Sequence, residues 1–395
     1  TRTFSRKLLA ASAALTVAAA GAVFGGVGSA ARAAGGPAIG HVFVIVLENQ
    51  SYAGTFGTPS ADPYLAQTLP SQGALLTQYY GTGHVSNDNY IAMISGQAPN
   101  LQNQADCQIY DDFTGLGPLP QDSALFPGQM VGTGCVYPQS VATVANQLTA
   151  AGLTWKGYME DMGNVPSREA AVCGHPADNS LDRTQSAVAG DGYVSRHDPF
   201  VYFHSIIDNA SYCDSHVVPL GSTSGALPAG APVGTTGLAT DLAQVSTTPN
   251  LSFISPNLCD DGHDYPCTNQ PSGASSLADI DAFLSEWVPL ITASPAYQQD
   301  GLLLITFDES DGPQSDASSC CNELPGPASP LPGITGPGGG RIGAVALSPH
   351  VTPGTVSNVG YNHYSLLASI ESFFSLSRLG YAGTATPFGS DILNR

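Results

Sequence analysis

The sequence predicts an α/β fold in which a largely parallel central sheet is flanked by helices on both faces. Short, nearly unbroken apolar runs occur along the chain, and such runs are typical of strands that are buried on both faces. Between them lie segments with apolar residues three and four positions apart, which is the spacing of one helix face. Strands that alternate with helices indicate a parallel sheet covered on both sides.

The first expected strand covers residues 41–47, with the sequence His-Val-Phe-Val-Ile-Val-Leu. Further apolar runs predict strands at residues 73–79, 153–159, 251–255, 301–307 and 342–348. Helical spacing predicts helices at residues 140–151, 276–292 and 363–374, with a shorter helical pattern at 90–94. Ligand sites in such sheets gather at the carboxyl ends of strands, so the polar residues that follow the strands are the candidates for chemistry.

The composition is that of an acidic globular protein. The chain has 395 residues and is 42% hydrophobic, which suffices for one large α/β domain or two ordinary ones. It carries 11 basic and 31 acidic side chains, a formal net charge of −20. Binding to nucleic acid depends on clustered Lys and Arg, so we expect no nucleic acid as a bound partner. We also expect no stable membrane association, because the mature chain lacks a basic amphipathic or long apolar segment.

Residues 1–33 have the layout of a secretory signal peptide. Arg2, Arg6 and Lys7 precede an apolar run of small residues, and Ala31-Arg32-Ala33 offers an A-x-A cleavage site. The alternative is a membrane anchor, because the run approaches spanning length. Its richness in Gly and Ala and the cleavage site favour removal, so we expect a secreted, extracellular protein.

Residues 34–395 are expected to form a single domain with loop-rich insertions. Polar, turn-rich or Gly/Pro/Ser-dense composition places these insertions near residues 100–138, 163–246 and 310–340. The first two insertions each contain two cysteines, and we expect the insertions to carry disulfide bonds.

Eight cysteines, an even number in an exported chain, predict up to four disulfides. Pairing of nearest neighbours, Cys107 with Cys135 and Cys173 with Cys213, is the simplest arrangement. Cys320 and Cys321 are adjacent, so we expect each to pair elsewhere, with Cys259 and Cys267 as the candidate partners.

Two of the expected strands end in acidic or amide residues. Glu48 and Asn49 follow the strand at 41–47, and Asp308 and Glu309 follow the strand at 301–307. Turn-forming residues at a strand end are the alternative interpretation. Carboxylate and amide oxygens suit a hard cation, and converging carboxylates repel one another unless a cation neutralises them. The sequence therefore predicts a metal site at this edge of the sheet.

Ser86 follows another expected strand and opens a helical pattern. A serine at this position is most often a helix cap, but a helix N-terminus also stabilises an anion such as phosphate. Ser86 does not lie in a G-x-S-x-G motif, which weakens a carboxylesterase interpretation. Metal coordination would instead activate its hydroxyl. Asn89, about one helical turn later, is expected to point to the same region and to donate to a substrate oxygen.

Five short motifs occur in order along residues 40–375. They are Leu47-Glu48-Asn49-Gln50-Ser51-Tyr52, His84-x-Ser86-x-x-Asn89-Tyr90, Arg196-His197-Asp198-Pro199-Phe200, Asp260-Asp261-Gly262-His263-Asp264 and Thr306-Phe307-Asp308-Glu309. Together they resemble the bacterial phosphoesterase family, which holds acid phosphatases and phospholipases C within the alkaline-phosphatase-like fold.

The resemblance implies a set of site residues and one divalent metal ion, with Ca, Mg, Mn and Zn all open. The positions that match the metal ligands are Glu48, Asn49, Ser86, Asp308 and Glu309, and Ser86 also matches the nucleophile. Asn89, His197 and His263 match residues that surround the transferred phosphoryl group. The sulfatase branch is set aside, because Tyr90 stands where that branch needs an arginine.

We therefore expect a metal-dependent phosphoric-ester hydrolase of the acid-phosphatase type, with a small phosphate ester as substrate. Ser86 would attack phosphorus to give a phosphoserine, which water then hydrolyses. His263 is the expected general acid, because nearby Asp residues favour its protonated form, and activity should favour mildly acidic pH.

Three questions stay open at this point. One alternative activity is a phospholipase C or another phosphodiesterase. An alternative of another class is an extracellular calcium- or carbohydrate-binding module without catalysis. His363, at the start of an expected helix, is either a cap residue or part of the wall of the site.

Overall fold

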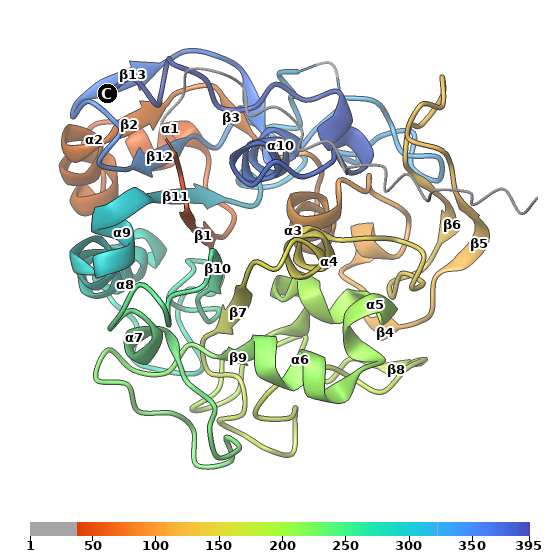
Figure 1. Ribbon diagram of the computed structural model, residues 1–395, viewed down its shortest axis with the longest axis horizontal. Helices are drawn as coiled ribbons and strands as arrows, with labels where there is room; N and C mark the ends of the chain where they lie inside the picture. Colours follow the sequence, from red (N-terminus) through yellow and green to blue (C-terminus); the bar gives the residue numbers. More distant parts are fainter. Residues whose placement is uncertain (1–37, 322) are drawn as a thin grey trace, which may run out of the picture.

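An eight-stranded sheet forms the centre of the computed structural model, which describes residues 38–321 and 323–395. The strand order is β13-β2-β12-β11-β1-β10-β7-β9 (Figure 1). The bounds are β1 His41–Leu47, β2 Ala74–Leu76, β7 Trp155–Met159, β9 Val217–Pro219, β10 Leu251–Ser255, β11 Gly301–Phe307, β12 Ala344–Leu347 and β13 Thr355–Ser357. The predicted signal peptide lies outside the described residues.

The sheet is largely parallel. Strands β11, β1, β10, β7 and β9 run in one direction, whereas β12 pairs antiparallel with both β11 and β2. Every residue of β1 and β11 is buried, as their continuous apolar sequences predict. The register pairs Leu47 with Phe307, so the residues that follow these two strands meet at one edge of the sheet.

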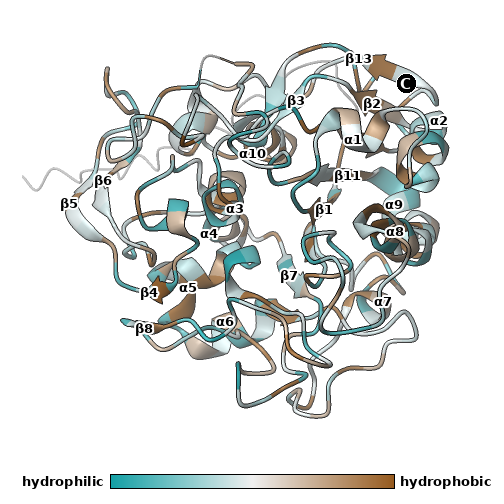
Figure 2. Cartoon of the chain, turned by 180° about the vertical axis from the view of Figure 1, so that it is seen from behind, coloured by the Kyte–Doolittle hydropathy of each residue, from teal (hydrophilic) through white to brown (hydrophobic). Residues whose placement is uncertain are grey.

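Helices cover both faces of the sheet, as predicted. In Figure 1, α3, α4 and α10 lie on one side, and α8 and α9 lie on the other. All ten residues of α3 are buried, because α3 packs between other elements rather than against solvent. Helix α8 is amphipathic and carries both hydropathy colours in Figure 2. The bounds are α3 Ser86–Ser95, α4 Val144–Ala150, α8 Ser276–Ala293, α9 Pro295–Asp300 and α10 His363–Phe373.

Shorter elements complete the architecture. The remaining α-helices are α1 Tyr52–Phe56, α2 Leu69–Gln72, α5 His204–Ile207, α6 Ala210–His216 and α7 Leu238–Asp241, and the π-helix η1 spans Tyr64–Thr68. The 3-10 helices are η2 Asn103–Ala105, η3 Ser195–His197, η4 Pro199–Tyr202 and η5 Gly380–Gly383. The two-stranded sheets pair β3 Tyr79–Tyr80 with β14 Tyr361–Asn362, β4 Ile109–Tyr110 with β8 Ser180–Leu181, and β5 Thr114–Pro118 with β6 Met130–Thr133.

The sequence predicted the central strands better than the outer ones. The strands expected at 41–47, 251–255 and 301–307 are confirmed residue for residue. The single strand expected at 73–79 is wrong: it divides into β2 and β3, with Thr77 between them bonded to the main chain of Ser357. The helix expected from residue 140 begins at Val144, because Thr143 and Asn146 form a capping box there.

The disulfide pairing is half as predicted. Cys107–Cys135 and Cys173–Cys213 are confirmed. The expected bonds between Cys320 or Cys321 and the pair Cys259 and Cys267 are wrong, because the bonds are Cys259–Cys267 and Cys320–Cys321. Each of these two bonds closes within one loop, at sequence separations of 8 and 1, so no distant loops are joined by them.

The loop-rich segments expected near 100–138 and 163–246 hold the short strands of the β4–β8 and β5–β6 pairs. Their description as insertions in a single domain stays a prediction. Of the helices in the described residues, none combines the length and the hydropathy that a membrane crossing requires.

Candidate active site

Three carboxylates from neighbouring strands converge at the carboxyl edge of the sheet. Glu48 follows β1, Asp308 follows β11, and Asp261 lies in the loop after β10. Main-chain hydrogen bonds hold these residues together: Glu48 N donates to Asp261 O, and Asp308 N donates to Leu47 O at the end of β1, both at 2.8 Å. All three side chains have an exposed fraction of 0%.

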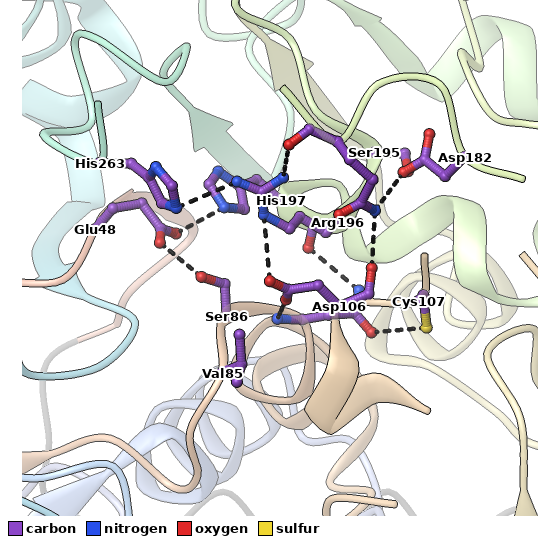
Figure 3. A network of polar contacts seen from close by, with 12 residues as sticks. Glu48, Val85, Ser86, Asp106, Cys107, Asp182, Ser195, Arg196, His197 and His263 are labelled. Carbon is purple, nitrogen blue, oxygen red and sulfur yellow. Dashed lines mark hydrogen bonds and ion pairs between the residues drawn. The ribbon is translucent and has the colours of Figure 1, made fainter. Parts of the chain in front are cut away.

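Ser86 is the first residue of α3 and points at this group of carboxylates. The N-cap position of α3 is occupied by Val85, and no side-chain cap hydrogen bond is present there among the described residues. The hydroxyl of Ser86, the next residue, is therefore not used to cap the helix. Instead, Ser86 Oγ donates to Glu48 Oε2 at 2.8 Å (Figure 3). The hydroxyl therefore lies where a helix N-terminus meets buried acidic oxygens.

Tyr90 and His197 complete the contacts of Glu48. Tyr90 Oη donates to Glu48 Oε1 at 2.7 Å, and the Tyr90 ring stacks on His197 with centroids 5.1 Å apart. His197 comes from η3, where its carbonyl accepts a 2.7 Å bond from Ser255 Oγ at the end of β10. Its Nδ1 lies 3.1 Å from Asp261 Oδ2, and its Nε2 lies 3.4 Å from Glu48 Oε1.

Arg196 and His263 lie beside this group (Figure 3). Arg196 Nη2 is 3.2 Å from His263 Nε2, and His263 Nδ1 is 2.8 Å from Asp264 Oδ1. A guanidinium can only donate, so Nε2 of His263 accepts the hydrogen bond from Arg196. The proton of the neutral ring is then on Nδ1, which donates a hydrogen bond to Asp264 Oδ1. The His263 side chain is 29% exposed, which places it at the open side of the site.

Burial shifts the pKa values of the site. Desolvation first, and then Asp308 and Asp261, raise the pKa of Glu48 well above its usual range. Burial likewise raises the pKa of Asp308 to about 7 and that of Asp261 well above normal. Burial, with Arg196 and His263 as further causes, lowers the pKa of His197 well below its usual range. The site therefore holds more acidic oxygens than its few cations balance.

The arrangement fits a divalent metal ion. One ligand atom each from Glu48, His197 and Asp261 lies within 4.8 Å of the others. Asp308 Oδ2 and His197 Nε2 are buried without a hydrogen-bond partner among residues 38–321 and 323–395. Buried polar atoms without partners are costly, and imidazole and carboxylate are common metal ligands. The residues that are present thus suit a cation.

Two of the predicted site residues, Asn49 and Asn89, make hydrogen bonds to other groups of the protein. Asn49 gives its main-chain N–H to Asp308 Oδ1 at 3.1 Å. Asn89 Oδ1 accepts from the amides of Thr82 and Gly83, and Asn89 Nδ2 donates to the carbonyls of Gly83 and Val85. Its side chain thereby orders the loop that presents Ser86, and contact with substrate stays a prediction.

Glu309 points away from Glu48. Its carboxylate pairs with His84 Nδ1, and His84 Nε2 donates to the carbonyl of Asp316 at 2.9 Å. Both residues lie in the bend after β11, where Asp308 Oδ1 accepts from Asn49 N and Glu309 turns to His84. Its role as a metal ligand stays a prediction.

His363 is not the cap of α10, because Asn362 occupies the N-cap position and accepts from Ser365 N. His363 is fully buried, and its Nε2 donates to the carbonyl of Asp308 at 2.6 Å. Burial lowers its pKa to about 4. His363 thus supports the strand end that carries Asp308.

Asp261, Arg196 and Tyr90 belong to the site, although we assigned them no role from the sequence. Each stands within one of the five motifs, next to or near a residue that was assigned. Asp261 comes several residues after Ser255, the last residue of β10, so a rule about residues directly following strands does not select it.

The chain is similar to known proteins over most of its length. The model of the Phosphoesterase family matches residues 60–377. The chain is 26% identical to a phosphatidylinositol-3-phosphatase of Mycobacterium tuberculosis, over 89% of this chain and 82% of that protein. It is 25% identical to an acid phosphatase of Aspergillus fumigatus over 87% of this chain, and it spans 57% of that relative's length.

A similar solved structure is a protein in the alkaline phosphatase superfamily from Vibrio parahaemolyticus, with 13% identity and a TM-score of 0.45. The match covers 87% of this chain and 69% of that one. The α/β fold class follows instead from the strand order and strand directions of the central sheet. The family match covers most of the chain, and the chain belongs to the phosphoesterase family and is a phosphoric-ester hydrolase.

Proposed function

We propose that this chain is a secreted, metal-dependent phosphatase of the acid-phosphatase type that acts through a phosphoserine on Ser86. The observation that carries the proposal is the 2.8 Å hydrogen bond from Ser86 Oγ to Glu48 Oε2, at a helix N-terminus and among converging carboxylates. The names of two relatives, an acid phosphatase and a phosphatidylinositol-3-phosphatase, support a phosphate ester as substrate.

Ser86 is oriented for attack on phosphorus. Glu48 Oε2 accepts a hydrogen bond from the Ser86 hydroxyl and is positioned to accept its proton during the attack. The first N–H groups of α3 and the helix dipole favour an anion beside Ser86, which suits the phosphoryl group before and after transfer. Asn89 keeps the preceding loop in place and so fixes the direction of the hydroxyl.

Glu48, Asp261 and His197 would hold the metal ion, with Asp308 beside them. A divalent cation bound there supplies charge neutralisation and Lewis acidity to a phosphate ester. Glu309 is paired with His84, and Asn49 contacts Asp308 through its main-chain N–H, so both stay predicted ligands beside this group.

His263 and His197 are the proposed neighbours of the phosphoryl group. His263 lies at the open side of the site, where the leaving group of a bound ester has room, and it is the proposed proton donor to the leaving oxygen. Secretion is supported by four disulfides among the described residues, which are typical of exported proteins.

The purified full chain should be assayed on p-nitrophenyl phosphate, bis-p-nitrophenyl phosphate and phosphatidylcholine, with and without a metal chelator. We expect the monoester to be the best substrate, with turnover that the chelator abolishes. A phospholipase C would instead favour the diesters. A non-catalytic binding module would turn over none of them, and that result would reject the proposal.

The matched variants are Ser86→Ala and Ser95→Ala. Both serines are buried in α3, but Ser95 Oγ contacts only main-chain groups: it donates to the carbonyl of Ile91 and accepts from the N–H of Gln97. We expect Ser86→Ala to lower kcat by about 10⁴-fold or more and Ser95→Ala to change it by less than about threefold. Mass spectrometry after an acid quench should find phosphate on Ser86 in the wild-type chain.

A further inference from the structure

Arg196 is a buried cation beside the nucleophile. Its exposed fraction is 3%, and it precedes His197 in η3 (Figure 3). Buried arginines are rare unless they are paired, so the partners of each nitrogen indicate what the side chain is for.

One end of Arg196 is anchored. Nη1 donates to the carbonyl of Gln185 at 2.9 Å, and the main-chain carbonyl of Arg196 accepts from Asn87 Nδ2 at 3.2 Å. Asn87 N in turn donates to Asp106 Oδ1 at 3.0 Å. Because Asn87 directly follows Ser86, these bonds fix Arg196 relative to the nucleophile.

The other edge of the guanidinium is not fully used. Nε is buried without a hydrogen-bond partner in the part of the chain that the structure describes. Its nearest acidic oxygen, Asp106 Oδ2, lies at 3.6 Å, which is too long for a hydrogen bond. Nη2 donates to His263 Nε2, a neutral acceptor. Nε–H and Nη2–H form the edge that binds two oxygens of a phosphate in a bidentate manner.

The positive charge of Arg196 also affects which class of phosphate ester the site can bind. A phosphate monoester carries up to two negative charges, whereas a diester carries one. The site already contains Glu48, Asp261 and Asp308, so the second charge of a monoester is repelled unless a cation faces it. Arg196 is a permanent cation, and its main-chain carbonyl is bonded to Asn87, the residue after Ser86.

We propose that Arg196 determines specificity: its Nε and Nη2 donate to two oxygens of the phosphoryl group and make the site prefer phosphate monoesters to diesters. Binding of the phosphoryl group takes Nη2 from His263, so that the unprotonated Nε2 can take a proton from solvent and pass it to the leaving oxygen. This inference rests on the proposed function and adds to it the residue that determines the preference for monoesters.

The alternative is that Arg196 only balances the charge of Asp106 and Asp261. That structural role predicts an equal loss of activity on both classes of ester. The ratio of kcat/KM for p-nitrophenyl phosphate to kcat/KM for bis-p-nitrophenyl phosphate therefore distinguishes the two, together with the inhibition constant of inorganic phosphate.

The variants are Arg196→Gln and Arg196→Lys in the metal-loaded full chain. The control is Arg168→Gln, because Arg168 is another largely buried arginine, held by Asp191 and by carbonyls in the loop of residues 184–193. We expect Arg196→Gln to lower kcat/KM for the monoester by about 10²-fold to 10³-fold and for the diester by less than about 10-fold. The inhibition constant of phosphate should rise by about 10-fold or more.

Arg196→Lys retains the charge without the bidentate edge, so the ratio should fall to an intermediate value. It also keeps the test decisive if Arg196→Gln does not fold. An unchanged ratio in both variants, with wild-type turnover intact, would overturn this inference alone. Turnover of neither ester by the wild-type chain would overturn the proposed function and the inference with it.

Discussion

Two groups of acidic side chains in this protein have different surroundings, although each contains a buried carboxyl with a raised pKa. Asp62 and Asp281 lie at the start of η1, where Asp62 Oδ1 accepts from Leu65 N at 2.8 Å and Asp281 Oδ1 accepts from Tyr64 N at 2.7 Å. Burial first, and then the hydrogen bond to Asp281, raise the pKa of Asp62 to about 8. Both members of this pair hold the main chain of a helix start through their Oδ1 atoms.

The carboxylates near Ser86 have different hydrogen-bond partners. Glu48 accepts from two side-chain hydroxyls, those of Ser86 and Tyr90, rather than from main-chain N–H groups. Asp308 Oδ2 has no hydrogen-bond partner among the residues that the structure describes. Burial alone therefore does not identify a functional carboxylate. The difference lies in what donates to its oxygens: main-chain N–H groups at Asp62 and Asp281, and the hydroxyls of Ser86 and Tyr90 at Glu48. Among the described residues Asp62 Oδ2 also lacks a hydrogen-bond partner, so an unpaired oxygen does not distinguish the two groups.

Among the variants that test this comparison of carboxyls, the largest effect is expected from Glu48→Gln. The change removes the oxygen that accepts the Ser86 proton and a proposed metal ligand, and we expect kcat to fall by about 10³-fold. The control is Glu371→Gln, because Glu371 is equally buried but its Oε1 accepts from the main-chain N–H of Leu379. Steady-state kinetics should show the control within about threefold of wild type. Equal losses in both variants would remove the distinction between the two kinds of carboxyl.

A smaller effect, dependent on the substrate, is expected from His263→Ala. If His263 protonates the leaving oxygen, the loss of kcat should be about 10²-fold for an alkyl phosphate and less than about 10-fold for p-nitrophenyl phosphate. His363→Ala is the comparison, because both ring nitrogens of His363 contact protein atoms, Asp308 O and Tyr79 Oη. Its loss should be the same for both substrates. Equal losses for His263→Ala would reject the assigned role.

The smallest effect on activity is expected from Asp62→Asn, which should change stability instead. The pKa of Asp62 is about 8 in the folded chain and near 3.8 ordinarily, so the folded state binds a proton that the unfolded state lacks between these values. The wild-type chain thus loses stability as pH rises through this window, by about 1.4 kcal/mol per unit at most.

Asparagine mimics the protonated acid and does not titrate. Urea unfolding should therefore find Asp62→Asn close to wild type at pH 5 and more stable than wild type at pH 8, with kcat unchanged. The same difference in unfolding free energy at both pH values would show that Asp62 does not bind a proton in the folded chain.

Much of the central fold follows from the sequence, because burial on both faces restricts a strand to apolar residues. That is why β1, β10 and β11 were predicted with their correct ends. The direction of a strand has no such signature, since an apolar run reads the same way in a parallel or an antiparallel strand. The antiparallel pairing of β12 with β11 therefore appears only in the structure.

The site shows the same division. Local order along the chain determined that Glu48, Asp308 and Ser86 follow strands or begin a helix, and neighbouring parallel strands must bring such residues to one edge. Tertiary structure alone decided that Asp308 faces Ser86 while Glu309 faces His84, and that Asp261 and Arg196 enter from separate loops. The reason is physical: the direction of a side chain depends on packing with segments far away in the sequence, and no local pattern encodes it.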